Sequence, residues 1–459
     1  MDDLFTRLRA EEFGRLDATG QVYLDYTGSG LYPESLVRGH AEMLCGSVLG
    51  NPHSNNPTSA AASELVDRAR ARVHEYFDAD PAEYEVVFTP NATGALRLVG
   101  ESFPFTAGSR YVLTADNHNS CNGIREYAHA RGAGVDYVPL DADLRIANVR
   151  PHLEGADRAR ANLFVFPAQS NFSGVKHPLE WIGEAQGLGY RVFVDAAAYL
   201  PHNRISLRQV QPDFLCLSFY KMFGFPTGVG VLLARTQALC DLQRPWFCGG
   251  TVRFVSATSE VCKPYHTSRG FEDGTLNFLD IAAVPAGLDW LERVGVDRIR
   301  THAMALTQRL LAGMAELRHS DGSPLVRVYG PADVGCDCHG ATLALNVLDA
   351  DGVVVFFKEV EQRAREERIS IRTGYFCNPG AAEYAFDHPA REVSTCTEED
   401  EFDIHAYSAC MQRRPVGAIR VSLGVASTEG DVDAFLRHLA GYRDQRFAPD
   451  ALSALAHAD

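Results

Sequence analysis

A lysine stands directly after an apolar run in the stretch CLSFYKMFGFPTG, residues 216–228. The chain has only four lysines among its 43 Lys and Arg residues, so a lysine beside an apolar segment is unexpected. Burial at the end of a strand disfavours the ammonium form and so favours a neutral, nucleophilic amine. The other lysines follow loop-like segments or lie in a predicted amphipathic helix: Lys176, Lys263 and Lys358. Lys221 is therefore the candidate nucleophile.

Polar residues follow several other apolar segments that we predict to be strands. His118, Asn171 and Asp195 each come just after such a segment, and the Thr-Gly sequence at 91–94 opens a predicted helix. Taken singly, these residues are ordinary turn formers or helix caps. Ligands of open α/β sheets bind beyond the carboxyl ends of the strands, so we expect these groups to meet Lys221 there. An amine, a carboxylate, an imidazole and a helix N-terminus together fit pyridoxal 5′-phosphate.

The residue types assign roles toward pyridoxal phosphate. Lys221 forms the Schiff base, and Asp195 keeps the pyridine nitrogen protonated, which makes the ring a stronger electron sink. Ser218 stands three residues before Lys221, so alternation places it on the opposite strand face unless the strand has already turned. The backbone N–H groups expected to bind the phosphate belong to Ala92, Thr93 and Gly94. A dinucleotide site is excluded, because no G-x-G-x-x-G occurs.

Strand-like apolar segments alternate with helix-like ones from about residue 84 onward. β-branched and aromatic residues dominate the strand-like segments, and the helix-like ones carry apolar residues at helical spacing. This alternation predicts an α/β fold with a mainly parallel sheet covered by helices on both faces. We predict seven strands, near 84–90, 110–118, 134–140, 161–170, 190–198, 213–221 and 228–235. Helices between them are predicted near 93–103, 121–132 and 178–189.

The length of 459 residues predicts two domains. We expect a large domain over 25–295 and a smaller α/β domain over 296–459, joined by residues 1–24. The smaller domain has predicted strands near 340–349, 369–373 and 418–423, and helices at 352–367 and 429–441. The acidic, aperiodic stretch 391–410 is interpreted as a solvated surface insert, with a docking surface as the alternative.

Composition and charge exclude several classes of protein. The net charge of -16 and the pI of about 5.5 argue against nucleic-acid and anionic-membrane partners, which need basic patches. No apolar run approaches the ~18 residues of a membrane span, and the charged start differs from a signal peptide, so we expect a cytoplasmic protein. The eleven cysteines are therefore expected to be reduced thiols. Residues 336–339 (CDCH) are interpreted as ordinary packing, with no metal site.

Ten stretches, in order from residue 23 to 424, resemble a known family. They are YLDYTGSGLYP, GNPHSNNPTS, LTADNHNS, FPAQSNFSG, VDAAAY, SFYKMFGFPTGVG, GGTV, FEDGTLNFL, RTGYFCNPGA and GAIRVSLG. The sequence resembles class V, fold-type I pyridoxal-phosphate enzymes. Within that group it is most similar to the N-terminal, cysteine-desulfurase-like domain of molybdenum cofactor sulfurases. The resemblance implies a homodimer with shared sites.

The resemblance also implies roles for individual residues. His118 stacks on the pyridine ring and shuttles protons, and Asn171 faces the phenolic oxygen of the cofactor. Thr251 reaches the phosphate of a neighbouring subunit. Arg420 grips the substrate carboxylate, for which a planar guanidinium is suited, and Arg372 lines the same mouth. Ala197 is assigned to the cofactor site and His53 to the substrate site.

Two positions depart from the pattern of many desulfurases. Ala198 stands where many have a glutamine, which implies one hydrogen bond fewer to the phenolic oxygen. Tyr220 stands where many have a histidine before the lysine, as in the sulfurase branch.

The possible reactions differ in whether Cys377 takes part. It lies in RTGYFCNPG, a Gly- and Pro-bounded loop just after a basic residue, where exposure and positive potential favour the thiolate. The resemblance implies that Cys377 takes sulfur from L-cysteine as a persulfide and leaves alanine, with Lys221 and His118 moving protons. One alternative is a C–S lyase, or a biosynthetic β- or γ-elimination or substitution enzyme, in which Cys377 plays no part. Another is a non-enzymatic scaffold that binds a sulfur-accepting protein through residues 391–410.

Overall fold

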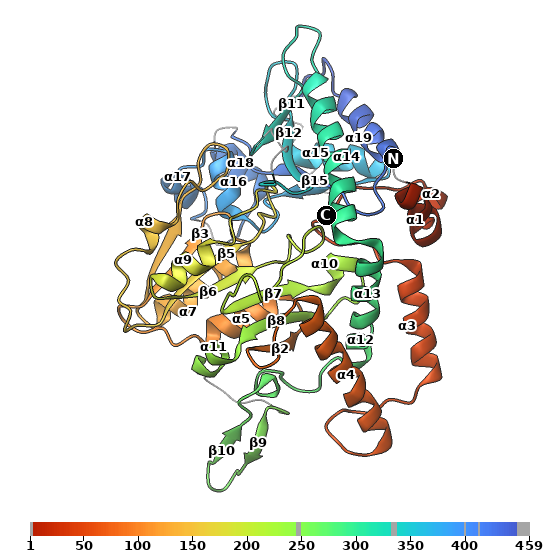
Figure 1. Ribbon diagram of the computed structural model, residues 1–459. Helices are drawn as coiled ribbons and strands as arrows, with labels where there is room; N and C mark the ends of the chain where they lie inside the picture. Colours follow the sequence, from red (N-terminus) through yellow and green to blue (C-terminus); the bar gives the residue numbers. More distant parts are fainter. Residues whose placement is uncertain (1–2, 245–248, 332–336, 399–400, 412–413, 448–459) are drawn as a thin grey trace.

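The computed structural model describes residues 3–244, 249–331, 337–398, 401–411 and 414–447. Seven strands form one sheet in the order β2-β8-β7-β6-β5-β3-β4 (Figure 1). They are β2 (Tyr84–Thr89), β8 (Gly230–Arg235), β7 (Phe214–Ser218), β6 (Tyr190–Asp195), β5 (Asn162–Pro167), β3 (Arg110–Thr114) and β4 (Gly134–Val138). β8 runs antiparallel to both of its neighbours, and the remaining pairs are parallel. The prediction of an α/β fold with a mainly parallel, seven-stranded sheet is confirmed.

Helices cover both faces of this sheet because successive strand residues point to opposite faces and are apolar on both. In β7, Phe214 and Cys216 pack toward α5 (Ala92–Ser102), whereas Leu215 and Leu217 pack toward the opposite face. Helices on the Phe214 side also include α7 (Ile124–Ala130) and α11 (Thr236–Asp241). The Leu215 side is covered by α4 (Pro57–Tyr76), α13 (Val284–Val294) and, at the β5 and β6 end, α8 (Arg150–Leu153) and α9 (Trp181–Gly187).

A second, antiparallel sheet lies above the first in Figure 1. Its order is β11 (Val326–Tyr329), β12 (Thr342–Val347), β15 (Ala418–Ser422) and β14 (Arg372–Gly374). The helices α14 (Val296–Glu316), α15 (Phe357–Glu366) and α19 (Glu429–Ala440) accompany it. β1 (Val22–Tyr23) pairs with β13 (Ile369–Ser370), which places the start of the chain against this part of the protein. The domain boundaries themselves stay a prediction.

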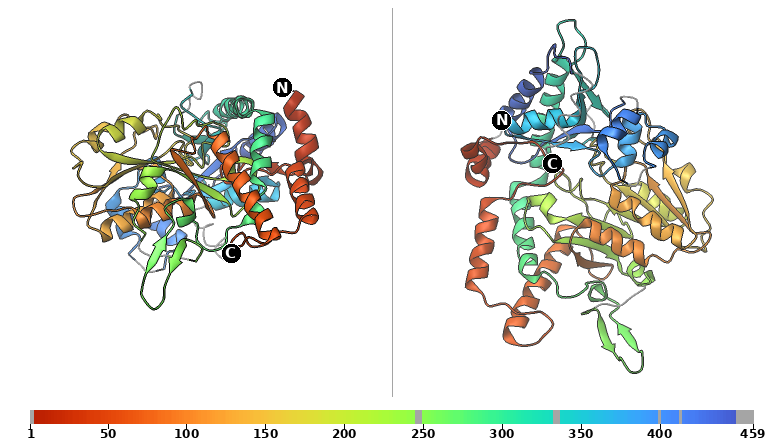
Figure 2. Two further views of the ribbon diagram at one scale, coloured as in Figure 1. Left: turned by 60° about the horizontal axis from the view of Figure 1, so that its bottom comes forward. Right: turned by 180° about the vertical axis from the view of Figure 1, so that it is seen from behind.

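Several further elements complete the fold. They are α1 (Asp3–Phe13), α2 (Arg15–Thr19), α3 (Glu34–Gly46), α6 (Asn119–Asn122), α10 (Phe219–Phe223), β9 (Val252–Val255), β10 (Cys262–Pro264), the 3-10 helix Ser268–Gly270, α12 (Phe278–Ile281) and α16 (Pro379–Ala385). The β9–β10 hairpin projects from the body on the side away from the second sheet (Figure 2). Within the described ranges, every helix is too short or too polar to cross a membrane.

The stretch 391–410 differs from the predicted aperiodic insert. It contains most of α17 (Ala390–Thr395) and all of α18 (Ile404–Cys410), and Cys396 and Cys410 form a disulfide between them. Tyr407 is buried against Met411 and Phe357, so one face of this segment packs on the protein; residues 399–400 lie outside the described residues.

The prediction that all cysteines are reduced is therefore wrong for Cys396 and Cys410, whose Cα atoms lie 5.8 Å apart. Linear spacing gave no sign of this pairing, because it depends on how α18, which ends at Cys410, lies against the end of α17 next to Cys396. Cys338 is also disulfide-bonded, and Cys336 lies outside the described residues.

Candidate active site

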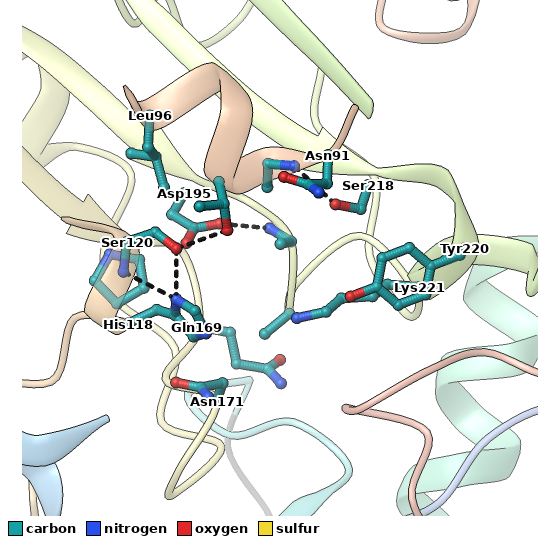
Figure 3. Close-up of a pocket in the computed structure, with 15 residues that line it drawn as sticks. Asn91, Leu96, His118, Ser120, Gln169, Asn171, Asp195, Ser218, Tyr220 and Lys221 are labelled. Atoms are coloured by element: carbon teal, nitrogen blue, oxygen red, sulfur yellow. Dashed lines mark hydrogen bonds between the residues drawn. The ribbon is translucent and has the colours of Figure 1, made fainter. Parts of the chain in front are cut away.

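One pocket opens at the carboxyl ends of the parallel strands (Figure 3). It brings together most of the predicted cofactor residues, although they come from five separate segments of the chain. Its lining comprises Asn91, Ala92, Thr93, Leu96, His118, Ser120, Pro167, Gln169, Asn171, Asp195, Ala197, Ala198, Ser218, Tyr220 and Lys221. The sequence alone had not singled out Asn91, Ser120 or Gln169.

Lys221 lies on a helix rather than at the end of a strand. β7 ends at Ser218, and the chain turns directly into α10, which carries the lysine. This early turn brings Ser218 and Lys221 to the same pocket, which strict strand alternation would have prevented. Burial lowers the pKa of Lys221, and nearby Asp195 opposes that shift. Among the described residues, Lys221 Nζ has no hydrogen bond or ion pair, so the amine is available to a ligand.

The N-terminus of α5 is partly occupied by side chains. The N–H of Ala92 donates to Ser218 Oγ at 2.9 Å, and the N–H of Gly94 donates to Asn91 Oδ1 at 2.9 Å. In the described part of the chain, the Thr93 N–H has no acceptor, and the Ser218 hydroxyl keeps its own proton for donation. The predicted anion site thus uses one free N–H and adjacent hydroxyls, at the positive end of the helix dipole.

Asp195 carries a buried carboxylate with one engaged oxygen. Its Oδ1 accepts from the Ala197 N–H at 2.9 Å and lies 3.8 Å from the Cys216 sulfur. Oδ2 has no hydrogen bond to any described residue, and the residue is only 7% exposed. A buried anion of this kind fits a cationic ligand group such as a protonated pyridine nitrogen.

His118 sits beside Asp195 in a fixed orientation. Its Nδ1 accepts the Ser120 N–H at 3.1 Å and also contacts Ser120 Oγ at 2.9 Å. A nitrogen that accepts a backbone N–H is unprotonated, so the neutral ring carries its proton on Nε2. Burial lowers the pKa of His118, while Asp195 opposes this shift and Lys221 adds to it. His118 is therefore a neutral imidazole at pH 7.

The loop that carries Cys377 folds onto this pocket through two asparagines. Asn171 donates from Nδ2 to the Phe376 carbonyl at 2.7 Å, and Asn378 donates to Asn171 Oδ1 at 2.9 Å. The Asn119 N–H donates to the Cys377 carbonyl at 2.7 Å. Phe376 and Cys377 adopt φ of 53° and 54°, a left-handed conformation that non-glycine residues rarely take. These hydrogen bonds hold a strained turn whose cysteine is exposed.

Two arginines share one carboxylate beside this loop. Arg420, which is buried, donates from Nη2 to Asp25 Oδ1 at 2.9 Å and from Nη1 to the Asn171 carbonyl at 3.0 Å. Arg372, which is half exposed, donates from Nη2 to Asp25 Oδ2 at 2.7 Å. The hydrogen bond that Arg372 donates to Asp25 raises the pKa of Arg372. Two guanidinium groups and one carboxylate leave one net positive charge, which suits an anionic substrate group.

Two predicted residues lie elsewhere. His53 lines a separate cavity with Gly250, Tyr265 and Glu272, and its ring nitrogen lies 3.2 Å from the Gly274 carbonyl. Thr251 is buried next to Gly250, and neither Thr251 nor His53 lines the Lys221 pocket. Within one chain these two residues and Lys221 do not share a site.

Comparisons with known proteins agree with this architecture. The model of the aminotransferase class-V family matches residues 22–435. Among solved structures, a cysteine desulfurase from Thermococcus onnurineus NA1 superposes with a TM-score of 0.79 at 24% identity, over 95% of this chain and 97% of that chain. The cysteine desulfurase CsdA from Escherichia coli superposes with a TM-score of 0.75 at 22% identity, over 95% and 98% of the two chains.

Curated relatives are more similar in sequence. The molybdenum cofactor sulfurase of Bos taurus is 36% identical over 95% of this chain and 51% of its own length. That of Arabidopsis thaliana is 35% identical over 94% of this chain and 57% of its own length. The chain therefore spans about half the length of the curated relatives that it matches. These matches confirm the resemblance that the ten sequence stretches carried, and the chain belongs to the aminotransferase class-V family.

Proposed function

We propose that this chain binds pyridoxal phosphate at Lys221 and removes sulfur from L-cysteine, giving alanine and a persulfide on Cys377. The observation that carries the proposal is the joining of the Lys221 pocket to the Cys377 loop through Asn171 and Asn378. Sulfurases and desulfurases among its relatives and structural neighbours support the same reaction class. When bound, the cofactor supplies an electron sink for negative charge that develops at the substrate Cα.

The protein's own groups then supply binding and proton transfer. Asp195 Oδ2 holds the pyridine nitrogen in its protonated form, and the Thr93 N–H and the Ser218 hydroxyl bind the phosphate. The depressed pKa of Lys221 makes its Nζ a proton acceptor for the substrate Cα. His118 carries a proton on Nε2 in its neutral form and donates it on the other side of the pocket.

The substrate carboxylate is proposed to bind the Arg420–Asp25–Arg372 cluster. Arg420 Nε is buried and has no hydrogen-bond acceptor among the described residues, so one of its donors is left for a ligand. Asp25 keeps both guanidinium groups in place and lowers the cost of burying the Arg420 charge. The net positive charge attracts the carboxylate, and the planar donor group orients it.

Cys377 is proposed to be the sulfur acceptor. The Cys377 thiolate attacks the substrate sulfur, the C–S bond breaks with its electron pair passing to the substrate carbon, and a proton completes the methyl group of alanine. L-cysteine and a thiol thus become alanine and a persulfide, with no outside oxidant or reductant. Because Cys377 is exposed, we propose that its persulfide passes to a separate acceptor molecule at this mouth.

Mass spectrometry after incubation with L-cysteine tests the proposal. We expect one added sulfur on the Cys377 peptide and release of alanine. Cys377→Ser should still bind L-cysteine at the cofactor, seen as an absorption change, but should release no alanine, because a hydroxyl cannot accept sulfur as a persulfide. Cys240→Ser is the matched control, since Cys240 is also free and exposed, and it should turn over normally. Undiminished turnover in Cys377→Ser with pyruvate as the product would instead indicate a C–S lyase.

We further propose a homodimer in which His53 and Thr251 complete the site of the other subunit. The β9–β10 hairpin supports this, because its projecting surface exposes Phe254, Val255 and Val261 by 58%, 46% and 37%. Subunits that carry Lys221→Ala, mixed with subunits that carry Thr251→Ala, should regain activity, because one site of the heterodimer escapes both changes. Full activity in a species that sediments as a monomer would refute the shared site.

A further inference from the structure

Gln169 is a polar residue of the pocket that the roles above leave unexplained. It follows β5, is 1% exposed and lines the same pocket as Lys221. Both its Oε1 and its Nε2 are buried without a hydrogen-bond partner in the described structure. Buried side-chain amides are nearly always paired, so an amide that faces a pocket with two open positions indicates a ligand group.

The surroundings of Gln169 keep its amide in place. A Cβ atom on Gly340 would lie 2.2 Å from Gln169 Oε1, so the amide rests directly against the Gly340 backbone. The Gln169 backbone pairs with Lys176, whose N–H donates to the Cys338 carbonyl at 2.9 Å. The loop between them turns at Gly174, where φ is +80° and a Cβ would lie 2.4 Å from the Thr342 carbonyl oxygen. This packing holds the loop and the amide in one arrangement.

The positions of the other groups indicate which atom of the cofactor Gln169 contacts. In the proposed site, Asp195 would hold the pyridine nitrogen, the start of α5 would bind the phosphate, and Lys221 would bond the aldehyde carbon. The remaining polar atom of the ring is the phenolic oxygen, which lies next to that carbon. Figure 3 shows the Gln169 amide pointing into the pocket toward the end of Lys221 and toward Asn171.

Asn171 has one N–H left for this oxygen, because its Oδ1 and the other N–H are engaged by Asn378 and the Phe376 carbonyl. Ala198 offers no polar side chain. We propose that Gln169 Nε2 donates a hydrogen bond to the phenolic oxygen of bound pyridoxal phosphate and so acts as a positioning residue. This inference rests on the proposed cofactor.

A pH titration of the cofactor's absorption, without substrate, tests this inference. With the cofactor bound, the Lys221 nitrogen and the phenolic oxygen would share a proton, and its loss would leave a full negative charge on the oxygen. A donor at Gln169 stabilises that anion, so Gln169→Met should move the spectral midpoint upward by about one pH unit, given the strength of a hydrogen bond to a charged group. Gln362→Met, a substitution on the exposed face of α15, is the matched control and should leave the midpoint unchanged.

A second variant changes the position of the Gln169 amide without replacing Gln169 itself. Gly340→Ala places a methyl group against the Gln169 amide and should move the midpoint in the same direction as Gln169→Met. A midpoint that is unchanged in both variants, with a raised KM for L-cysteine, would overturn the inference and make Gln169 a substrate contact. A wild-type protein that takes up no pyridoxal phosphate would instead refute the proposed function itself.

Discussion

Replacing Asn378 by alanine should destabilise the protein and release the loop that carries Cys377. The Asn378 side chain is fully buried and makes three hydrogen bonds. Its Nδ2 donates to the Asp116 carbonyl at 2.7 Å and to Asn171 Oδ1 at 2.9 Å. Its Oδ1 accepts the Ala381 N–H at 3.2 Å, which caps α16. One side chain thus ties together the cysteine loop, the end of β3 and a residue of the pocket.

The magnitude follows from these three bonds. A buried hydrogen bond contributes about 1 kcal/mol net, and a lost N-cap costs a similar amount, so Asn378→Ala should cost about 3 kcal/mol. The unpaired Asn171 Oδ1 adds to this cost. Asn203→Ala is a matched control, because Asn203 is 2% exposed and makes one hydrogen bond, from Nδ2 to the Tyr199 carbonyl at 2.9 Å. The control should lose about 1 kcal/mol.

Two measurements check this prediction. Urea unfolding of the purified proteins should give a larger loss for Asn378→Ala than for Asn203→Ala. Alkylation of Cys377, followed by peptide mass spectrometry, should become faster in Asn378→Ala, while the exposed Cys45 and Cys240 react at unchanged rates and act as internal references. Equal losses of stability in the two variants, with an unchanged Cys377 rate, would refute the reasoning.

Two further predictions concern pH and redox conditions. Burial lowers the pKa of both His202 and His339 to about 4, so the unfolded chain binds more protons below pH 6.5 and stability falls as the pH drops from 6.5 toward 4. Each histidine should lower the free energy of unfolding by about 2 kcal/mol at pH 5. In urea unfolding, the loss of stability between pH 7 and pH 5 should therefore be smaller in the His202→Gln, His339→Gln double variant than in the wild type. An equal loss in both proteins would contradict this. Replacing Cys396 and Cys410 by serine should lower the free energy of unfolding by about 3 kcal/mol, because the disulfide spans 14 residues. Reductant should lower the stability of the wild type far more than that of the variant.

The fold and the residue types of the site followed from local sequence patterns. Each central strand is a short run of β-branched and aromatic residues that is buried on both faces. Its apolar pattern can therefore be recognised in the sequence without knowing which strands lie beside it. Lys221 and Asp195 were recognised as candidates because burying a charged group next to such a run costs free energy unless the charge is paired or binds a ligand. The general rule that ligands bind beyond the carboxyl ends of the strands then predicted that they meet.

Only the tertiary structure decided how these groups are oriented and paired. The end of β7 at Ser218 depends on the packing of α10, which the apolar sequence of residues 214–220 does not reveal. Asp25 and Arg420 are 395 positions apart, and their pairing arises because the start of the chain lies against the second sheet.

Contacts between distant segments also explain the other features that the sequence did not predict. Gln169 is ordinary in sequence, and its two open hydrogen-bond positions become visible only when its surroundings are known. The disulfide between Cys396 and Cys410 and the hydrogen bonds that hold Phe376 likewise join residues that local pattern treats separately. Local periodicity determines which segments become strands and helices, whereas contacts between segments distant in sequence determine which polar atoms remain free for chemistry.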